Sequence, residues 1–393
     1  ITMVYVGVGG RSIRSIKNVI VKDLQCNTII SQEMINELMD INRNMTYPDQ
    51  EILDAATQEY KIDNQYQIDP VGIQCNHLEG IFLNILWRKN FSNNINTCFE
   101  NANIPIAEMY LAPLAMADSV LTDSEKRAGC MLVDLGADTT TVSVYYKGIL
   151  RHLSVIPLGG GNVTKDLTCL QIEEPDAEKM KLKYAKAYTD INNSDPTLNY
   201  PIDKDRVVER NKFIESVEAR VEEIVENAWF QIPVEFSDKL LGGIILTGGG
   251  SNMPEIDKVF KTHTHIDKVR IAKFVSQTVN SKDPKITNHD GTMNTVLGLL
   301  AKGDMNCAGD EIGTDLFSNS AEKPVAAEQH KAPRNPNETA GKGVVLTAAE
   351  KAAADEAARK QKELEEAEAR LLAEKEAEEE VRKRLPALTD SLT

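Results

Sequence analysis

A predicted hairpin in the middle of the chain constrains the fold more than any other segment. Residues 132–148 read LVDLGADTTTVSVYYKG, in which an apolar strand runs into Asp134 and a second, β-branched strand follows the tip. The tip holds Gly136, which permits close backbone approach, and the hydroxyl groups of Thr139 and Thr140. Backbone N–H groups and hydroxyls in such a turn suit a phosphate, and Asp134 is placed to hold Mg²⁺ through water. The alternative is an ordinary hairpin with an aspartate turn, because short Gly-Thr motifs also arise by chance.

A second glycine-rich stretch strengthens the first interpretation. Residues 240–255 read LLGGIILTGGGSNMPE, a strand followed by Gly248, Gly249 and Gly250 and then by a predicted helix with Ser251 as its N-cap. Three glycines at a strand end let the backbone approach a flat group such as a nucleoside. Two such motifs in this order resemble the way in which the actin–Hsp70–sugar-kinase superfamily holds ATP.

Composition excludes several classes of protein. The net charge of −16 argues against a nucleic-acid-binding protein. The six cysteines stand far apart with no C-x-x-C motif, which favours a reducing compartment. No apolar run reaches transmembrane length, and no signal peptide opens the sequence. His263 and His265 have no acidic or cysteine partners at ligand spacing in the sequence, so we expect a solvated loop there and no metal site.

The segments on either side of the hairpin predict further modules. Over residues 1–104 we expect a small α/β module with strands at 4–8, 12–16, 58–63 and 81–87 and helices from Ser31 and over 90–101. After the hairpin, Gly159 to Gly161 stand between a strand and a helix, either as a plain turn or as a part of the nucleotide site. Over 175–235 the sequence predicts charged helices, one of them with a buried stripe formed by Phe213, Val217, Val221, Ile224 and Val225.

The C-terminal region has a different composition. Residues 319–346 are rich in Ala, Pro, Glu, Lys, Asn and Gly, which predicts a disordered linker. Residues 347–393 carry acid-first charge pairs at i,i+4 spacing, such as Glu356 and Lys360, which predict an exposed single helix followed by a tail. The apolar stripe in this segment is too sparse for a coiled coil.

Together these segments resemble the FtsA family of actin-like bacterial cell-division proteins over about residues 1–303. The resemblance rests on VYVGVGGRSIRSI near the start, QEYKIDNQYQIDPVG at 58–72 and LRHLSVIPLGGGNVTKD at 150–166. The sequence DLGADTTTVSVYYKGIL is similar to that of family members from Bacteroidetes-like bacteria. Because the chain begins inside the family pattern, we expect an N-terminally truncated member that lacks the first phosphate loop.

The resemblance implies an α/β, two-lobed, actin-like fold that binds ATP and Mg²⁺ in its cleft. Members self-assemble and tether the FtsZ ring to the cytoplasmic face of the inner membrane at the division septum. The matching positions are Asp134, Gly136, Thr139 and Thr140 for the second phosphate loop, with Asp134 as the metal residue, Gly248, Gly249 and Gly250 for the adenosine loop, and Lys181 for a cation beside the adenosine.

The resemblance also implies a division into subdomains. These are 1C over 1–104, the remainder of 1A over 105–130 and 289–318, 2A over 131–165 and 239–288, and 2B over 166–238, followed by the linker over 319–346 and the charged helix and tail over 347–393. Subdomain 2B would receive the C-terminal tail of FtsZ, and the 1C module would mediate contacts between protomers.

Two departures from the family pattern bear on activity and on membrane contact. Ala112 stands where the family carries a Gln or Glu before a proline, so we expect weak or no ATPase activity. The last residues lack an aromatic and basic amphipathic helix, so the sequence does not show how the membrane is reached.

Three other classes of protein share the fold or its motifs. A sugar kinase needs a carboxylate base in the cleft, and the sequence between the two loops offers no candidate. A Hsp70-like chaperone would carry a β-sandwich after the nucleotide lobe, whereas residues 304–393 predict a linker and a helix. An actin-like pilus-assembly protein shares the 1C-type module and stays an alternative.

Overall fold

A computed structural model of the chain describes residues 2–190, 199–305, 307, 337, 339–356 and 359–360. The chain divides into two compact units, residues 1–316 with 339–345 and residues 317–338 with 346–393. In the second unit a helix over 348–356 is capped by Thr347, whose hydroxyl oxygen accepts a hydrogen bond from the Glu350 amide at 3.3 Å. The predictions for residues 319–336 and 361–393 lie outside the described residues.

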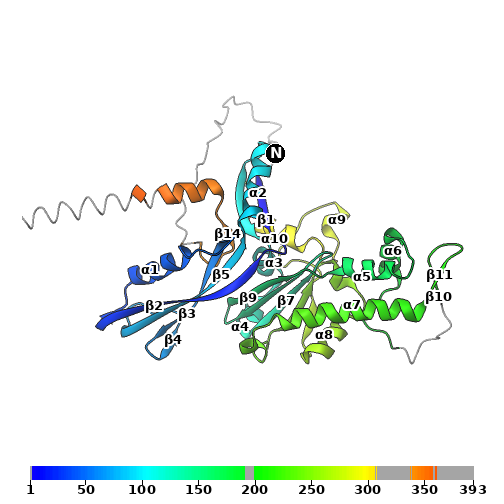
Figure 1. The fold of residues 1–393 in the computed structure, drawn as a ribbon, viewed down its shortest axis with the longest axis horizontal. Coiled ribbons are helices and arrows are strands. Elements are labelled where there is room, and N and C mark those ends of the chain that lie inside the picture. The colour runs from blue at the N-terminus through cyan, green and yellow to red at the C-terminus, as the bar shows by residue number, and fades with distance from the viewer. Residues whose placement is uncertain are drawn as a thin grey trace, which may run out of the picture. The chain divides into compact units, whose positions relative to one another are not determined.

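The first unit is built on one long mixed sheet (Figure 1). Its nine strands follow the order β13-β12-β7-β8-β9-β2-β5-β3-β4. Their bounds are β2 Arg14–Ile29, β3 Gln50–Ile62, β4 Gln65–Gln67, β5 Gln74–Arg88, β7 Cys130–Leu135, β8 Thr140–Tyr146, β9 Ile149–Ile156, β12 Gly243–Thr247 and β13 Val269–Ile271. Strands β12 and β7 are parallel, whereas β7, β8 and β9 form an antiparallel meander.

Two smaller sheets and a set of helices complete the unit. The sheets join β1 Val4–Val8, β6 Ile106–Leu111 and β14 Val344–Val345 in the order β1-β6-β14, and β10 Asn199–Pro201 with β11 Val207–Glu209. The helices are α1 Gln32–Arg43, α2 Lys89–Asn101, α3 Ala112–Val120, α4 Asp123–Ala128, α5 Gly160–Thr168, α6 Glu174–Tyr184, α7 Arg210–Phe230, α8 Ile256–Thr264, α9 Pro284–Thr287 and α10 Asn294–Lys302, with 3-10 turns η2 Val234–Phe236 and η3 Gly249–Asn252.

Strand β7 is apolar and buried from Cys130 to Val133 because both faces of the sheet are covered there. Met131 and Val133 face one hydrophobic core, and Leu132 faces the other. The first of these cores also contains the predicted apolar stripe of α7, whose five residues are all buried. Figure 1 shows α7 alongside α8, and α7 packs against both α8 and α5. Full burial of one such apolar side chain contributes about 1.5–3 kcal/mol to the free energy of folding.

The two halves of the long sheet meet at a narrow junction. Strand β2 pairs with β9 only through Arg14 and Ser154. Side chains reinforce this contact, since the Gln58 amide donates to the Leu150 carbonyl at 2.9 Å and the Arg151 guanidinium forms an ion pair with Glu59 at 3.1 Å.

The N-terminal module differs from the prediction at its first strand. Strand β1 pairs in parallel with β6 and so belongs to a different sheet from β2. The turn between β1 and β2 contains Gly10 with φ +111°, which lets the chain leave one sheet and enter the other. The range 1–104 therefore contains one strand whose partner lies beyond it.

The prediction of a disordered linker over 319–346 is wrong for residues 339–345. Strand β14 pairs antiparallel with β6, and the buried Asp54 carboxylate accepts hydrogen bonds from the amides of Gly341 at 2.9 Å and Gly343 at 2.8 Å. Both glycines have positive φ, which aims their N–H groups at the carboxylate. Composition could not reveal this contact, because Asp54 lies far away in the sequence.

Replacement of Asp54 by alanine tests this attachment. Asp54→Ala should raise hydrogen exchange at Gly341 and Gly343 and lower the free energy of unfolding by about 2–3 kcal/mol, because hydrogen bonds to a charged group are lost in a buried place. The exposed Asp69, replaced in the same way, is the control and should change stability by less than about 1 kcal/mol. Unchanged exchange at the two glycines would contradict the role given to Asp54.

Candidate nucleotide-phosphate site

The two glycine-rich motifs meet at one edge of the long sheet. The predicted hairpin is formed by β7 and β8, with Asp134 opposite Thr141. Strand β12 lies beside β7 in the parallel direction, so that Asp134 also pairs with Thr247. The tip of the hairpin and the glycine run 248–250 therefore leave the sheet side by side, where ligands of parallel α/β sheets commonly bind.

The contact between the two motifs requires glycine. Gly248 has φ +82°, and a Cβ atom on it would lie 2.3 Å from Oδ1 of Asp134. A Cβ atom on Gly250 would lie 2.9 Å from Cβ of Leu135. The backbone of the glycine run thus lies directly against the strand end that carries Asp134.

The helix after the glycine run begins later than the sequence predicts. Ser251 is not an N-cap, since its hydroxyl donates to the Gly248 carbonyl at 2.7 Å and closes the 3-10 turn η3. Helix α8 starts at Ile256, with Glu255 as its N-cap residue. Sequence alone did not distinguish the two roles, because serine favours both caps and short turns.

The glycine run 159–161 supports the hairpin tip. The Gly160 amide donates to the Gly136 carbonyl at 2.9 Å, and the Gly161 amide donates to the Ala137 carbonyl at 2.7 Å. A Cβ atom on Gly159 would lie 2.5 Å from the oxygen atoms of both tip residues. The sequence allows this run to be either a plain turn or a part of the nucleotide site. In the structure it lies against the hairpin tip.

The predicted phosphate-loop threonines differ in their surroundings. Thr140 is fully buried, and its hydroxyl donates to the Leu158 carbonyl at 2.9 Å. Its hydroxyl therefore holds the hairpin to the segment behind it. Thr139 lies in the tip half-buried, with its carbonyl accepting the Gly136 amide at 3.0 Å.

Lys181 lies behind the hairpin tip. From α6 its amino group donates to the Gly160 carbonyl at 3.0 Å and to the Thr164 hydroxyl at 2.9 Å, and it forms an ion pair with Glu178 at 2.7 Å. These contacts hold it at the first turn of α5. Lys181 therefore braces the glycine run 159–161, and its role toward a nucleotide stays a prediction.

Asp134 is a half-buried acidic side chain near the end of β7. Within the described residues it has no ion-pair partner. Burial raises the pKa of Asp134 to about 6. A cation bound beside this carboxylate would remove the unfavourable energy of a half-buried, unpaired charge.

Two groups at this edge were missed by the sequence analysis. The turn 290–292 packs on the glycine run, with the Asn252 side chain donating to the Asp290 carbonyl at 2.6 Å and Gly291 in a positive-φ conformation. The Arg11 guanidinium lies 3.5 Å from the Asp138 carbonyl of the hairpin tip. The Asp-Gly-Thr triplet is a recognisable turn signal, whereas nothing in the local sequence connects Arg11 with the hairpin.

Comparison with known proteins defines the class of this chain. Residues 131–291 match the family model described as "Cell division protein FtsA", and residues 10–86 match the model "SHS2 domain inserted in FTSA". The fold is thus actin-like with an inserted module. The chain belongs to the FtsA family.

Curated relatives agree with this assignment. FtsA of Porphyromonas gingivalis is 33% identical over 80% of this chain and 66% of its own length. FtsA of Pseudomonas aeruginosa is 32% identical over 63% of this chain and 61% of its own length. The chain therefore spans slightly less than two thirds of the length of these relatives.

Solved structures resemble the chain more distantly. The PilM–PilN type IV pilus biogenesis complex aligns with a TM-score of 0.46 at 12% identity, covering 73% of this chain and 76% of that one. MreB5 of Spiroplasma citri bound to ADP aligns with a TM-score of 0.42 at 14% identity, covering 54% and 64%. Among the described residues, no helix combines the length and the apolar character needed to cross a membrane.

Proposed function

We propose that this chain is a cell-division adaptor that binds Mg²⁺ and ATP, associates with itself and links the FtsZ ring to the cytoplasmic face of the inner membrane at the septum. The observation that carries the nucleotide part is the meeting of two glycine-rich loops beside Asp134, a half-buried carboxylate for which the described residues supply no ion-pair partner. Family membership supports the adaptor part.

The residues at the sheet edge fit a magnesium–nucleotide complex. Asp134 would hold Mg²⁺ through water, and the Thr139 hydroxyl would donate a hydrogen bond to the phosphates. Gly136, whose amide and carbonyl are both bonded within the protein, would allow the phosphates to approach closely. The open backbone of Gly249 would lie against the nucleoside, since a Cβ atom there has only the Thr292 methyl group at 3.5 Å. The bound metal would supply charge neutralisation for the phosphates.

Within the described structure, the position that the family resemblance assigns to hydrolysis carries no polar side chain. Ala112 is the first residue of α3 and ends in a methyl group, which cannot orient a water molecule. Asp118, on the same helix, is held by Lys126 at 2.6 Å and by Lys302 at 2.5 Å. We therefore expect phosphate release to be very slow, and a phosphate-release assay with Mg²⁺ and ATP measures it.

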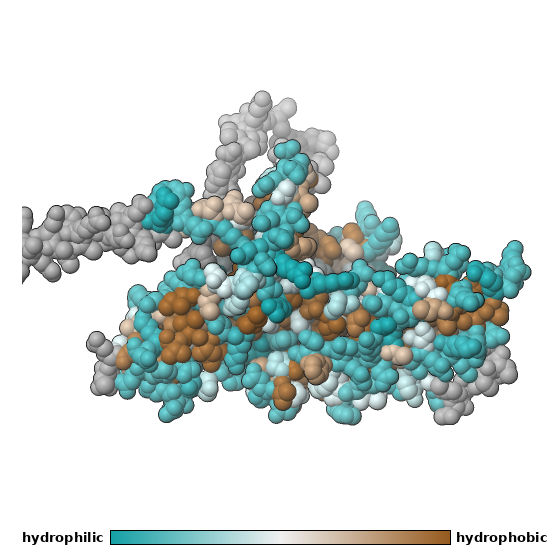
Figure 2. Space-filling view, viewed as in Figure 1, coloured by the Kyte–Doolittle hydropathy of each residue, from teal (hydrophilic) through white to brown (hydrophobic). Residues whose placement is uncertain are grey.

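The inserted module presents a surface suited to self-association. Val19 and Val21 point to the same face of β2 and are 44% and 54% exposed. Figure 2 shows apolar surface over this part of the sheet. Such a patch favours contact with another protein copy, and sedimentation velocity over a concentration series tests it.

A basic and apolar surface on α6 is our candidate for the FtsZ tail. Acidic residues outnumber basic ones over residues 166–238, so the net charge of this segment would not attract an acidic peptide. On α6, however, Lys179 and Lys183 are exposed on either side of Leu182, which is 77% exposed. This grouping suits a peptide that is both acidic and apolar.

Charge reversal on α6 tests the partner. The double variant Lys179→Glu with Lys183→Glu should weaken binding of an FtsZ tail peptide about tenfold, because two exposed charge contacts become repulsive. Lys285→Glu, a single charge reversal on α9, should leave the affinity unchanged. Equal affinities of the double variant and the wild-type chain in fluorescence anisotropy would place the peptide elsewhere.

A further inference from the structure

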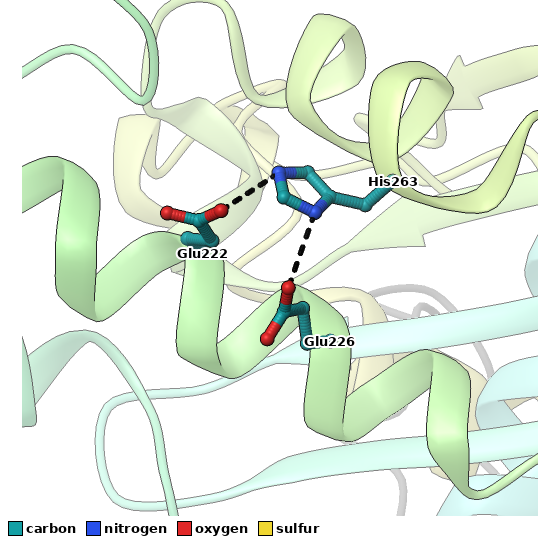
Figure 3. Close-up of side chains that lie close together, drawn as sticks. All are labelled: Glu222, Glu226 and His263. Carbon is teal, nitrogen blue, oxygen red and sulfur yellow. Dashed lines mark ion pairs between the residues drawn. The ribbon is translucent and has the colours of Figure 1, made fainter.

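Three metal-ligating side chains converge on the outer face of two packed helices. Glu222 and Glu226 lie on successive turns of α7, and His263 lies in the last turn of α8. Figure 3 shows the imidazole ring of His263 between the two carboxylates. The sequence prediction of a solvated loop at His263 and His265 is wrong for His263, because α8 extends through residue 264.

The backbones that carry these side chains are fixed by the core beneath them. Val221 and Val225 of α7 and Val259 and Phe260 of α8 are buried in one hydrophobic cluster. The Cα atoms of the three residues are therefore held in place without help from the polar groups themselves. A ligand at this point would meet a preorganised set of donors.

The three side chains can each offer one ligand atom within 4.8 Å of the others. The contacts of the His263 ring with the glutamates are longer than strong hydrogen bonds, and because a metal ion binds one ring nitrogen, only one of the two contacts can correspond to a pair of ligand atoms. Nε2 of His263 lies 3.5 Å from Oε1 of Glu222, and Nδ1 lies 3.5 Å from Oε1 of Glu226. Charge-assisted N–H···O⁻ hydrogen bonds are about 2.7–2.9 Å long. Two ligand atoms on one tetrahedral Zn²⁺, with bonds of about 2.0–2.1 Å, are separated by about 3.3–3.4 Å.

The charges around the cluster also favour a cation. Within the described residues neither Glu222 nor Glu226 forms an ion pair with Lys or Arg. Glu218, one turn earlier on α7, adds a third acidic side chain to this face; its carboxylate accepts hydrogen bonds from Thr189, while its Oε1 is buried with no hydrogen-bond partner in the described structure. His263 also stands at the C-terminal end of α8, where the helix dipole is negative.

We propose that Glu222, Glu226 and His263 form a Zn²⁺ site that clips α8 to α7, with water as the fourth ligand. A single ring nitrogen binds the metal, and the glutamate side chains, which are 54% and 61% exposed, turn to bring one oxygen each to it. His265 takes no part, because it terminates α8 in a left-handed conformation with φ +57°.

Titration of the full chain with ZnCl₂, after removal of metals by a chelator, tests the site. Isothermal titration calorimetry should show one Zn²⁺ per chain. His263→Asn and Glu226→Gln should each weaken the Zn²⁺ affinity by more than roughly 10- to 100-fold. That range is typical for the loss of a residue that only hydrogen-bonds to a metal ligand. His265→Asn is the matched control and should bind as the wild-type chain does.

Two further measurements distinguish Zn²⁺ binding at this site from Zn²⁺ binding by cysteines and from an ion pair that binds no metal. Co²⁺ in place of Zn²⁺ should give a four-coordinate visible spectrum without a thiolate charge-transfer band. Zn²⁺ should raise the melting temperature of the wild-type chain and not that of His263→Asn. Absence of stoichiometric binding, full binding by His263→Asn, or a thiolate band in the Co²⁺ spectrum would each overturn the proposal.

Discussion

Gly248→Ala is expected to lower the free energy of unfolding by about 2–5 kcal/mol. The left-handed conformation at φ +82° costs a non-glycine residue about 1–2 kcal/mol. The added methyl group would in addition lie 2.3 Å from the Asp134 carboxylate and 2.7 Å from the Leu135 carbonyl, so the strand end must shift, at about 1–3 kcal/mol. Urea denaturation of the purified chain measures the sum.

Gly249→Ala is the matched control for this prediction. Its added Cβ atom meets only the Thr292 methyl group at 3.5 Å, which is ordinary van der Waals contact. We expect its stability to remain within about 1 kcal/mol of the wild-type value. If both variants lose the same amount of stability, the close approach of Gly248 to Asp134 does not exist in solution.

Asp134→Asn is expected to stabilise the ligand-free chain at pH 7. The pKa of Asp134 is raised by burial to about 6 from an ordinary value of 3.8, so the folded chain binds a proton more tightly than the unfolded chain does. The wild-type chain therefore loses stability as the pH rises from about 4 through 6. At about 1.4 kcal/mol per pKa unit the loss is at most about 3 kcal/mol, and partial exposure of Asp134 makes it smaller.

The pH dependence distinguishes this effect from a general one. The difference in stability between Asp134→Asn and the wild-type chain should grow between pH 4 and pH 7 and then level off. Asp138→Asn, at the exposed tip of the same hairpin, should follow the wild-type curve. Parallel curves for Asp134→Asn and the wild-type chain over this range would contradict a buried, unpaired carboxylate at residue 134.

Local patterns in the sequence identified most of the central sheet and its two loops. The runs around Asp134 and before Gly248 are short, apolar and followed by glycine, and they form β7 and β12. The stripe on α7 follows helical periodicity and is buried. These features depend on neighbours in the chain, which is why sequence alone was enough for them.

The features that sequence missed depend on contacts between distant segments. Strand β14 exists because Asp54 holds Gly341 and Gly343, and the turn at Asp290 reaches the glycine run through Asn252. The spacing of Thr140 and Lys181 in the sequence did not show which protein groups their side chains contact. Their partners, the Leu158 and Gly160 carbonyls, become visible only in the folded chain.

The most direct test of the nucleotide proposal is calorimetric titration of the full chain with ATP, with and without Mg²⁺. We predict one ATP bound per chain in a Mg²⁺-dependent manner, abolished by Asp134→Asn although this variant is folded and stable. Absence of binding by the wild-type chain, or undiminished Mg²⁺-dependent binding by Asp134→Asn, would contradict a nucleotide site at the hairpin tip and the glycine run.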